Sequence, residues 1–231
     1  MGFELTAEND INRMALLIVA ESGVGKTSQC MTLNPDEVAF ISLESGDLCF
    51  KRTGYKPRLK SIIRTVDDLT ESFVQLNDGI EGIKYVFIDS LTEMGQLVLS
   101  ELKEDPRYTD PKNTLKMYGT YNEMMTKIIK SYRDMDKYTV IFTCLSSKEK
   151  DGMEVFDDYN IPGSSVKNML KSYFDLVLHM QAYKDGEEEK RVFLTNSSVS
   201  RLAKDRSGVL EEVEDANISN IIGKILGWRK K

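Results

Sequence analysis

Eight residues, Ala20 to Thr27, have the types and spacing of a loop that binds nucleotide phosphates. Its glycines let backbone N–H groups close on phosphate oxygens, Lys26 can reach the β- and γ-phosphates, and the Thr27 hydroxyl suits Mg²⁺. The usual pattern begins with glycine, and Ala20 fits the turn provided that its φ stays negative. ATP and Mg²⁺ are the expected cofactors, and the expected nucleotide-binding residues are Glu21, Ser22, Gly23, Val24, Gly25, Lys26, Thr27 and Ser28.

An acid ends a second apolar run, 85–88, where phosphate-loop enzymes place the carboxylate that holds the Mg²⁺ water shell. Asp89 occupies that position, so Thr27 and Asp89 are the expected metal-binding residues. Taken alone, Asp89 followed by Ser90 also suits a strand leading into a helix N-cap. The phosphate loop upstream favours the metal role.

The general base is expected on a different strand. Many ATPases place a second carboxylate directly after the metal-binding Asp, but Ser90 stands there. Glu44 ends the apolar strand that follows the loop helix, and open α/β sheets bind ligands at the carboxyl ends of their strands. Glu44 is therefore expected to act as the base that polarises water for attack on the γ-phosphate. Glu93 and Glu21 are weaker candidates for the same role. The alternative is a solvated Glu that opens a loop.

Further polar residues follow other predicted strands. Lys204 and Arg206 come after the last hairpin and can neutralise charge on a neighbour's phosphate, although two cations in a polar loop also suit solvated surface. Thr143 and Ser146 can sense the γ-phosphate, but such hydroxyls are more often simple loop formers.

Apolar, β-branched runs alternate with helical patterns through the first two thirds of the chain. This rhythm predicts a mainly parallel sheet with helices on both faces, and the strand 138–144 is expected between the phosphate-loop strand and the Asp89 strand. Thr65 is expected to cap a helix. The predicted strands are 14–20, 38–43, 61–66, 84–89 and 138–144, and the predicted helices are 27–33, 67–77, 91–103 and 118–136.

The last third of the chain predicts an antiparallel edge. Two strand-like runs, 174–183 and 191–196, flank the Asp185-Gly186 pair, which is a hairpin signal. Two polar segments, 104–117 and 146–165, exceed ordinary connections and are predicted to be long loops, which are usually functional or mobile.

Length and composition fit one α/β domain over residues 1–231, with 41% apolar and 29% charged residues. No apolar run approaches the about 18 residues of a membrane span, and the first residues lack a secretory signal. We therefore expect a cytoplasmic location without membrane contact. Cys30, Cys49 and Cys144 suit reduced thiols, and His179, in an apolar run, is assigned no chemistry.

The net charge of −6 argues against nucleic-acid binding over the whole surface, but local basic patches can still contact phosphates. Tyr118, Tyr121 and Tyr159 can stack bases, although the helical spacing of Tyr118 and Tyr121 favours core packing. The cations that can contact phosphates are Lys51, Arg52, Lys56, Arg58, Lys60 and Arg64, and a second group, Lys148, Lys150 and Lys167.

The placement of Glu44 on the strand after the loop helix, rather than beside Asp89, resembles the RecA/RadA class of recombinase ATPases. More narrowly, the chain resembles short phage-encoded RecA-like nucleotide-binding proteins associated with single-strand annealing recombination. The resemblance covers nearly the whole chain and is carried by residues 23–27, 42–46, 87–92, 118–119 and 201–208.

The resemblance implies a RecA-like P-loop NTPase core that assembles head to tail with ATP between protomers, in the host cytoplasm. Lys26 and Glu44 would act on the nucleotide of their own subunit, and Lys204 and Arg206 on that of the adjacent subunit. Residues 1–13 would take part in assembly, and segments 104–117 and 146–165 would bind single-stranded DNA. A single-strand-binding protein is a further implied partner.

The resulting expectation is a slow Mg²⁺-dependent ATPase, stimulated by DNA or assembly, that promotes annealing or strand exchange. The alternative is a nucleotide-gated assembly or signalling module that never touches DNA, which the acids of segment 146–165 and the negative net charge favour. A small-molecule kinase and a guanine-specific switch rank lower, because the sequence lacks an Arg-rich lid and an Asn-Lys-x-Asp signature.

Overall fold

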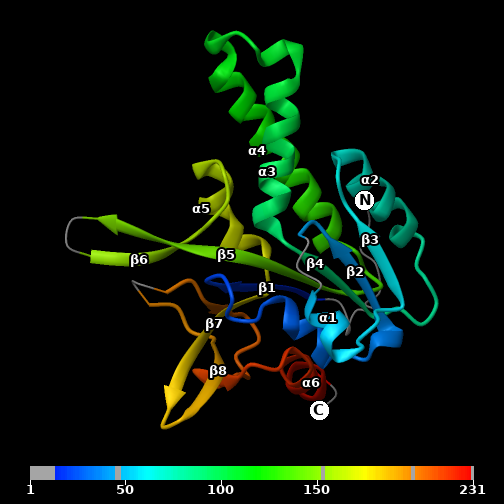
Figure 1. Cartoon of the computed structure of the whole chain (residues 1–231), viewed down its shortest axis with the longest axis vertical. Helices are drawn as coiled ribbons and strands as arrows, with labels where there is room; N and C mark the ends of the chain where they lie inside the picture. Colours follow the sequence, from blue (N-terminus) through cyan, green and yellow to red (C-terminus); the bar gives the residue numbers. More distant parts are fainter. Residues whose placement is uncertain (1–13, 45–47, 152–153, 199–200, 230–231) are drawn as a thin grey trace, which may run out of the picture.

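The described part of the chain is organised by a ten-stranded mixed sheet (Figure 1). This computed structural model describes residues 14–44, 48–151, 154–198 and 201–229; the predicted assembly segment 1–13 and residues 45–46 lie outside them. The strand order is β10-β8-β7-β1-β5-β4-β2-β3, with β6 paired to β5 and β9 to β7. The strands are β1 (Met14–Ala20), β2 (Val38–Ser42), β3 (Leu59–Ile62), β4 (Tyr85–Asp89), β5 (Thr139–Asp151), β6 (Glu154–Tyr159), β7 (Leu176–Asp185), β8 (Glu188–Leu194), β9 (Lys204–Asp205) and β10 (Val213–Asp215).

Strand β1 lies at the centre and is buried along its whole length. It pairs in parallel with β5 on one side and β7 on the other. Because successive side chains point to opposite faces, Leu17 and Val19 join one apolar core while Leu16 and Ile18 join the other. This two-sided burial explains why the strand is an unbroken apolar run rather than an alternating one.

Helices cover both faces of the sheet. Buried residues of α2 to α5 complete the first core, whereas the second core is completed by η2, α1 and α6. The α-helices are α1 (Leu48–Thr53), α2 (Val66–Asn77), α3 (Leu91–Glu104), α4 (Thr114–Arg133), α5 (Ser164–Tyr173) and α6 (Ile218–Arg229), and the 3₁₀ turns are η2 (Thr27–Thr32), η3 (Pro35–Glu37), η4 (Pro106–Tyr108) and η5 (Pro111–Asn113).

The predicted fold class is confirmed. Strand β5 lies between β1 and β4, as expected, and the five strands β1 to β5 pair in parallel. Strands β7 and β8 form the predicted antiparallel hairpin, whose turn contains Gly186 at φ +66°. Glycine suits this turn because it alone adopts positive φ without steric cost.

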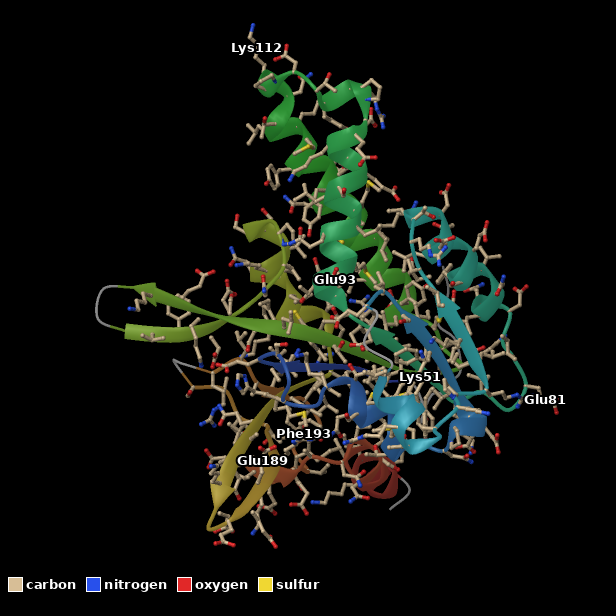
Figure 2. The ribbon with its side chains drawn as sticks, viewed as in Figure 1. Lys51, Glu81, Glu93, Lys112, Glu189 and Phe193 are labelled. Carbon is tan, nitrogen blue, oxygen red and sulfur yellow. The ribbon has the colours of Figure 1, made fainter. Side chains whose placement is uncertain are left out.

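Segment 104–117 is not the predicted loop. Helix α3 continues to Glu104, η4 and η5 follow, and α4 begins at Thr114. Each turn starts with a proline that an aspartate caps: the side chains of Asp105 and Asp110 accept from the backbone two residues on. Figure 1 shows α3 and α4 standing away from the sheet as a helical hairpin, with Lys112 at its tip in Figure 2.

Segment 146–165 is also not a loop. Strand β5 continues to Asp151 and pairs with antiparallel β6, and α5 begins at Ser164. Lys148 lies opposite Asp157 in this two-stranded ribbon, and the two side chains form an ion pair of 2.6 Å. Opposite charges placed across strands stabilise the pairing, so a polar sequence forms a ribbon here.

The segment after the phosphate loop is a 3₁₀ helix over Thr27–Thr32 rather than the predicted helix over 27–33. Leu33 already has extended backbone, with ψ at 155°, and Pro35 follows two residues later. A residue before proline avoids the helical region, so Asn34 is extended as well and the helix cannot continue toward Pro35.

A capping box begins α2, as the sequence predicts for Thr65. The Thr65 hydroxyl accepts from the backbone of Asp68, whose carboxylate accepts from the backbone of Thr65. Replacing Thr65 with Ala is therefore expected to lower the free energy of unfolding by about 1 kcal/mol, measured by urea denaturation. Thr70→Ala, inside the same helix, is the control, and an equal loss there would contradict a capping role.

Candidate nucleotide-binding site

The phosphate loop leaves the carboxyl end of β1 in the conformation its glycines allow. Gly23 and Gly25 have φ values of +80° and +111°, and no described non-glycine residue has positive φ. Ala20, the last residue of β1, is fully buried, and because it has no positive φ it meets the backbone condition stated for this position. The Lys26 ammonium is held inside the loop, 3.1 Å from the Ala20 carbonyl oxygen and 2.9 Å from that of Glu21.

Two hydroxyls converge on Asp89. Thr27 donates from Oγ1 to Asp89 Oδ2 at 2.7 Å, and Thr143 on β5 donates to the other carboxylate oxygen. Burial raises the pKa of Asp89, while the hydrogen bonds from Thr143 and Thr27 oppose that rise. Mg²⁺ prefers one or two carboxylates with hydroxyl, water and phosphate oxygens, so the Thr27–Asp89 pair is a donor set that fits this ion.

Glu44 lies beside the same group. The backbone amides of Leu43 and Glu44 donate to the Asp89 carbonyl oxygen at 2.7 and 3.2 Å. Ser90 Oγ donates to Glu44 Oε1 at 2.5 Å, so the serine that replaces a second acid holds the carboxylate of Glu44. Burial lowers the pKa of Lys26, and the charges of Asp89 and Glu44 oppose that shift, so these three groups form one electrostatic unit.

The weaker contenders for the base lie apart from this unit. Glu93 opens α3, where its amide donates to the Ser90 hydroxyl at 3.4 Å, and Figure 2 labels it at the base of that helix. Glu21 lies 3.8 Å from the Lys148 ammonium on the ribbon. Among the described residues, neither Glu93 nor Glu21 forms a hydrogen bond with Asp89, whereas the backbone amide of Glu44 does.

Lys204 and Arg206 lie at the opposite end of the sheet. Strand β9 pairs with Leu176 and Val177 of β7, and Leu176 pairs with Leu16, four residues before the end of β1. This separation is about 13 Å at roughly 3.3 Å per residue. Neither cation therefore reaches the phosphate loop of its own chain.

The two cations of this pair differ in their surroundings. Lys204 Nζ donates to the carbonyl oxygens of Lys171 and Phe174 at 3.1 and 2.7 Å, and burial lowers its pKa. Arg206 forms an ion pair of 2.8 Å with Asp175 and keeps 59% of its side chain exposed. Lys204 thus ties two chain segments together, while Arg206 remains available to another molecule.

Residues 12–207 match the model of a protein family described as AAA domain. This match spans far more than half of the chain. The chain belongs to this AAA domain family. The phosphate loop, Glu44, Asp89 and the basic pair all lie within the matched residues of the AAA domain.

Solved structures resemble the AAA domain at low sequence identity. A KaiC-like protein from Pyrococcus horikoshii is 14% identical over 78% of this chain and 77% of its own, with a TM-score of 0.39. The flagellar accessory protein FlaH from Methanocaldococcus jannaschii is 12% identical over 87% of this chain and 83% of its own, with a TM-score of 0.44. No curated protein matches the sequence.

Sequence reasoning missed Arg191, which lies against the phosphate loop of the AAA domain. A Cβ atom on Gly25 would stand 3.1 Å from Arg191 Nη1, so the guanidinium covers the loop at that residue. Arg191 also forms an ion pair of 2.9 Å with Glu189, labelled on β8 in Figure 2. No motif marks this arginine, because its position depends on how β8 pairs with β7 and β7 with β1.

A chain of charged groups links the phosphate loop to the ribbon. Lys148 lies between Glu21 and Asp157, and Asp157 is 3.7 Å from His179 Nε2. His179 is buried, which lowers its pKa, and its Nδ1 has no hydrogen-bond partner among the described residues. Ser146, expected near the nucleotide, likewise has a buried hydroxyl without a partner among those residues.

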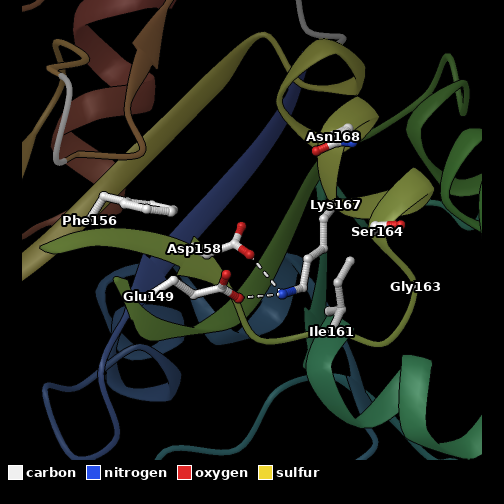
Figure 3. Close-up of a pocket in the computed structure, with 8 residues that line it drawn as sticks. All are labelled: Glu149, Phe156, Asp158, Ile161, Gly163, Ser164, Lys167 and Asn168. Atoms are coloured by element: carbon white, nitrogen blue, oxygen red, sulfur yellow. Dashed lines mark hydrogen bonds and ion pairs between the residues drawn. The ribbon is translucent and has the colours of Figure 1, made fainter. Parts of the chain in front are cut away.

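A pocket of about 470 Å³ lies between the ribbon and α5, and its lining includes no residue of the phosphate loop (Figure 3). Lys167 extends into it and forms ion pairs with Glu149 and Asp158 at 3.0 and 2.7 Å, so its charge is already balanced. Within the described ranges there is no group of three or more His, Cys, Asp or Glu side chains suited to a metal ion. No described helix has the length and apolar character needed to cross a membrane.

Proposed function

We propose that this protein is a Mg²⁺-dependent ATPase that assembles into homo-oligomers and binds single-stranded DNA to promote annealing or recombination. The observation that carries the ATPase activity is the meeting of the loop lysine, the Thr27–Asp89 pair and Glu44 at the carboxyl ends of β1, β4 and β2. The segment after β1 supplies Lys26 and Thr27, β4 supplies Asp89, and the segment after β2 supplies Glu44.

Each group has a distinct role in this proposal. The loop amides and Lys26 bind the β- and γ-phosphates, and Thr27 with Asp89 would hold Mg²⁺. The ion, when bound, neutralises phosphate charge that develops in the transition state. Thr143 fixes the Asp89 carboxylate, because its hydroxyl donates to the oxygen that does not face Thr27.

Glu44 acts as the general base in this proposal. Its carboxylate accepts the Ser90 hydroxyl through Oε1, which leaves Oε2 to accept a hydrogen bond from the attacking water. The carboxylate polarises that water toward the γ-phosphate. Ser90 therefore orients the base, a task that a second carboxylate at its position could not perform as a donor.

Assembly completes the site in this proposal. Arg206 is exposed and lies at the amino end of the sheet, so it reaches a nucleotide only on another copy of the chain. An arginine supplied in this way neutralises transition-state charge. Lys204 supports this segment through its bonds to Lys171 and Phe174 rather than by contacting the phosphate.

The test measures ATP hydrolysis with and without single-stranded DNA, together with the oligomeric mass with ATP. Hydrolysis that rises with DNA and a mass increase with ATP are expected. No hydrolysis by the wild type under either condition would overturn the ATPase activity. Hydrolysis without any DNA binding would overturn only the DNA part and leave the second candidate function.

That second candidate is a nucleotide-gated assembly ATPase that does not bind DNA. It is favoured by the ion pairs of the ribbon: its acids are paired with Lys148 of β5 and Lys167 of α5, so these two lysines offer no free charge to phosphates. A mass increase with ATP that is indifferent to added DNA would select this function.

Arg191 is expected to contribute to nucleotide affinity. Because its guanidinium covers the loop at Gly25, Arg191→Ala should weaken ATP binding about 10-fold or more, the value of a charge-assisted hydrogen bond. Fluorescent nucleotide titration checks this. Lys190→Ala, the adjacent exposed cation paired with Asp185, is the matched control, and equal effects of the two variants would contradict a local role for Arg191.

A further inference from the structure

The most concentrated positive charge of the described residues lies on the segment 51–64, which we call the basic strip. Six cations and no acid occur between Leu48 and Val66, in a chain whose net charge is −6. All six side chains are exposed: Lys51, Arg52, Lys56, Arg58, Lys60 and Arg64. They belong to α1, to β3 and to the residues that connect and follow these elements, and Lys51 on α1 is labelled in Figure 2.

The strip lies on an open edge of the molecule. Strand β3 ends the sheet order and pairs only with β2 among the described strands. Lys60 and Ile62 point away from the core, as the alternating burial of this strand indicates. An edge strand rich in Lys and Arg resists pairing with another strand, and it leaves an extended line of charge in solvent.

The cations of the strip remain largely unbalanced. Lys51, Arg52 and Lys56 form no ion pair with any residue that the structure describes, and neither do Arg58 and Arg64. Arg64 does lie beside Asp68. The pKa of Asp68 is lowered mainly by hydrogen bonds from the backbone amides of Arg64 and Thr65, and to a smaller extent by the charge of Arg64. Elsewhere, two of the expected DNA-binding cations are neutralised, because Lys148 and Lys167 pair with acids on the ribbon. Arg107, near the helical hairpin tip, likewise pairs with Asp105.

Exposed apolar side chains accompany this charge. Leu48, three residues before the strip, is 71% exposed, and Ile62, near its end, is 59% exposed. A polyanion with unstacked bases offers both phosphates and apolar ring faces, whereas a duplex keeps its bases stacked inside. We infer that the basic strip, rather than segment 104–117 or 146–165, is the surface that binds single-stranded DNA. This inference rests on the proposed function.

The strip is also connected by hydrogen bonds to the end of strand β2, which leads to Glu44. Ile63 donates its amide to the Ser42 carbonyl oxygen at 2.9 Å, and Ser42 donates its hydroxyl to the Glu44 carbonyl oxygen at 2.6 Å. Ordering of the strip by DNA therefore acts on the backbone that carries Glu44. Stimulation of hydrolysis by DNA follows from this connection.

The test compares two variants of the full chain that each remove four exposed lysine or arginine charges. The strip variant carries Lys51→Ala, Arg52→Ala, Lys56→Ala and Arg64→Ala. The control variant carries Lys103→Ala, Lys112→Ala, Lys116→Ala and Lys127→Ala on the helical hairpin, where all four side chains are exposed. Binding of labelled oligo-dT with a non-hydrolysable ATP analogue is measured by fluorescence anisotropy over a range of salt concentrations, and thermal unfolding confirms that both variants fold.

We expect the strip variant to bind oligo-dT at least 10-fold more weakly, and its slope of log K against log salt to shrink by about 2 to 3, because each lost phosphate contact removes about 0.7. The control variant should bind within about 2-fold of the wild type. Wild-type affinity in the strip variant, or an equal loss in the control, would overturn the assignment while leaving DNA binding intact. Hydrolysis by a wild type that binds no oligo-dT would also overturn it, whereas a wild type without hydrolysis would instead contradict the proposed ATPase.

Discussion

Replacing Lys26 with alanine is expected to lower kcat/KM for ATP by about 10²- to 10³-fold, the effect of deleting one preorganised group that stabilises developing charge. The ammonium is buried inside the loop and lies in the electrostatic unit with Asp89 and Glu44. Its loss also removes the cation that binds the β- and γ-phosphates, so nucleotide affinity should fall as well. Steady-state hydrolysis and nucleotide titration measure the two effects.

Lys84→Ala is the matched control for Lys26→Ala. The Lys84 side chain is 63% exposed and pairs with Glu37 at 2.6 Å on the surface, so its loss should leave hydrolysis within about 2-fold of the wild type. Thermal unfolding of Lys26→Ala confirms its fold. A folded Lys26→Ala variant with normal turnover would remove the phosphate loop from the mechanism.

Replacing Glu44 with glutamine is expected to separate binding from turnover. The amide can still accept the Ser90 hydroxyl and keeps the size of the side chain, but it cannot act as a base. We expect nucleotide affinity to stay within about 3-fold while kcat falls by about 10²- to 10⁴-fold, the contribution of a positioned general base. Single-turnover hydrolysis and nucleotide titration measure these two quantities.

Glu93→Gln and Glu21→Gln are the comparisons for this result, because both acids lie close to the loop or to Ser90. Each should retain at least about half of wild-type turnover if Glu44 is the base. A larger loss in Glu93→Gln than in Glu44→Gln would transfer the role to the acid at the start of α3. Loss of nucleotide affinity in Glu44→Gln would instead indicate a structural task for this carboxylate.

The parallel core could be predicted because its strands carry their own signal. A strand that is buried on both faces, such as Met14–Ala20, is recognised as an apolar run with turn residues on either side. The phosphate loop then shows where this strand ends. Because strands that alternate with helices are parallel, their carboxyl ends lie at the same edge of the sheet. The sequence therefore predicts that Glu44 and Asp89 lie close to each other. Ser90 holds Glu44 in place, a contact between side chains 46 positions apart that no local pattern encodes.

The polar segments could not be predicted because their structure depends on distant partners. The ribbon of β5 and β6 has no apolar alternation, and charge pairs such as Lys148 with Asp157 appear only when the strands are already opposed. Arg191 reaches Gly25 only through two successive strand pairings. Tertiary contacts therefore decide the residues that complete the site, while local pattern decides the strands that carry it.

Arg206 and the phosphate loop lie at opposite ends of the sheet. Under the proposed function, a single copy of the chain therefore holds two half-sites and no complete site. Under the proposed assembly, turnover in dilute solution rises with the square of the protein concentration. Copies that carry Lys26→Ala and copies that carry Arg206→Ala then complement each other when mixed, because the intact loop of one meets the intact arginine of the other. Activity becomes a property of neighbours rather than of single molecules.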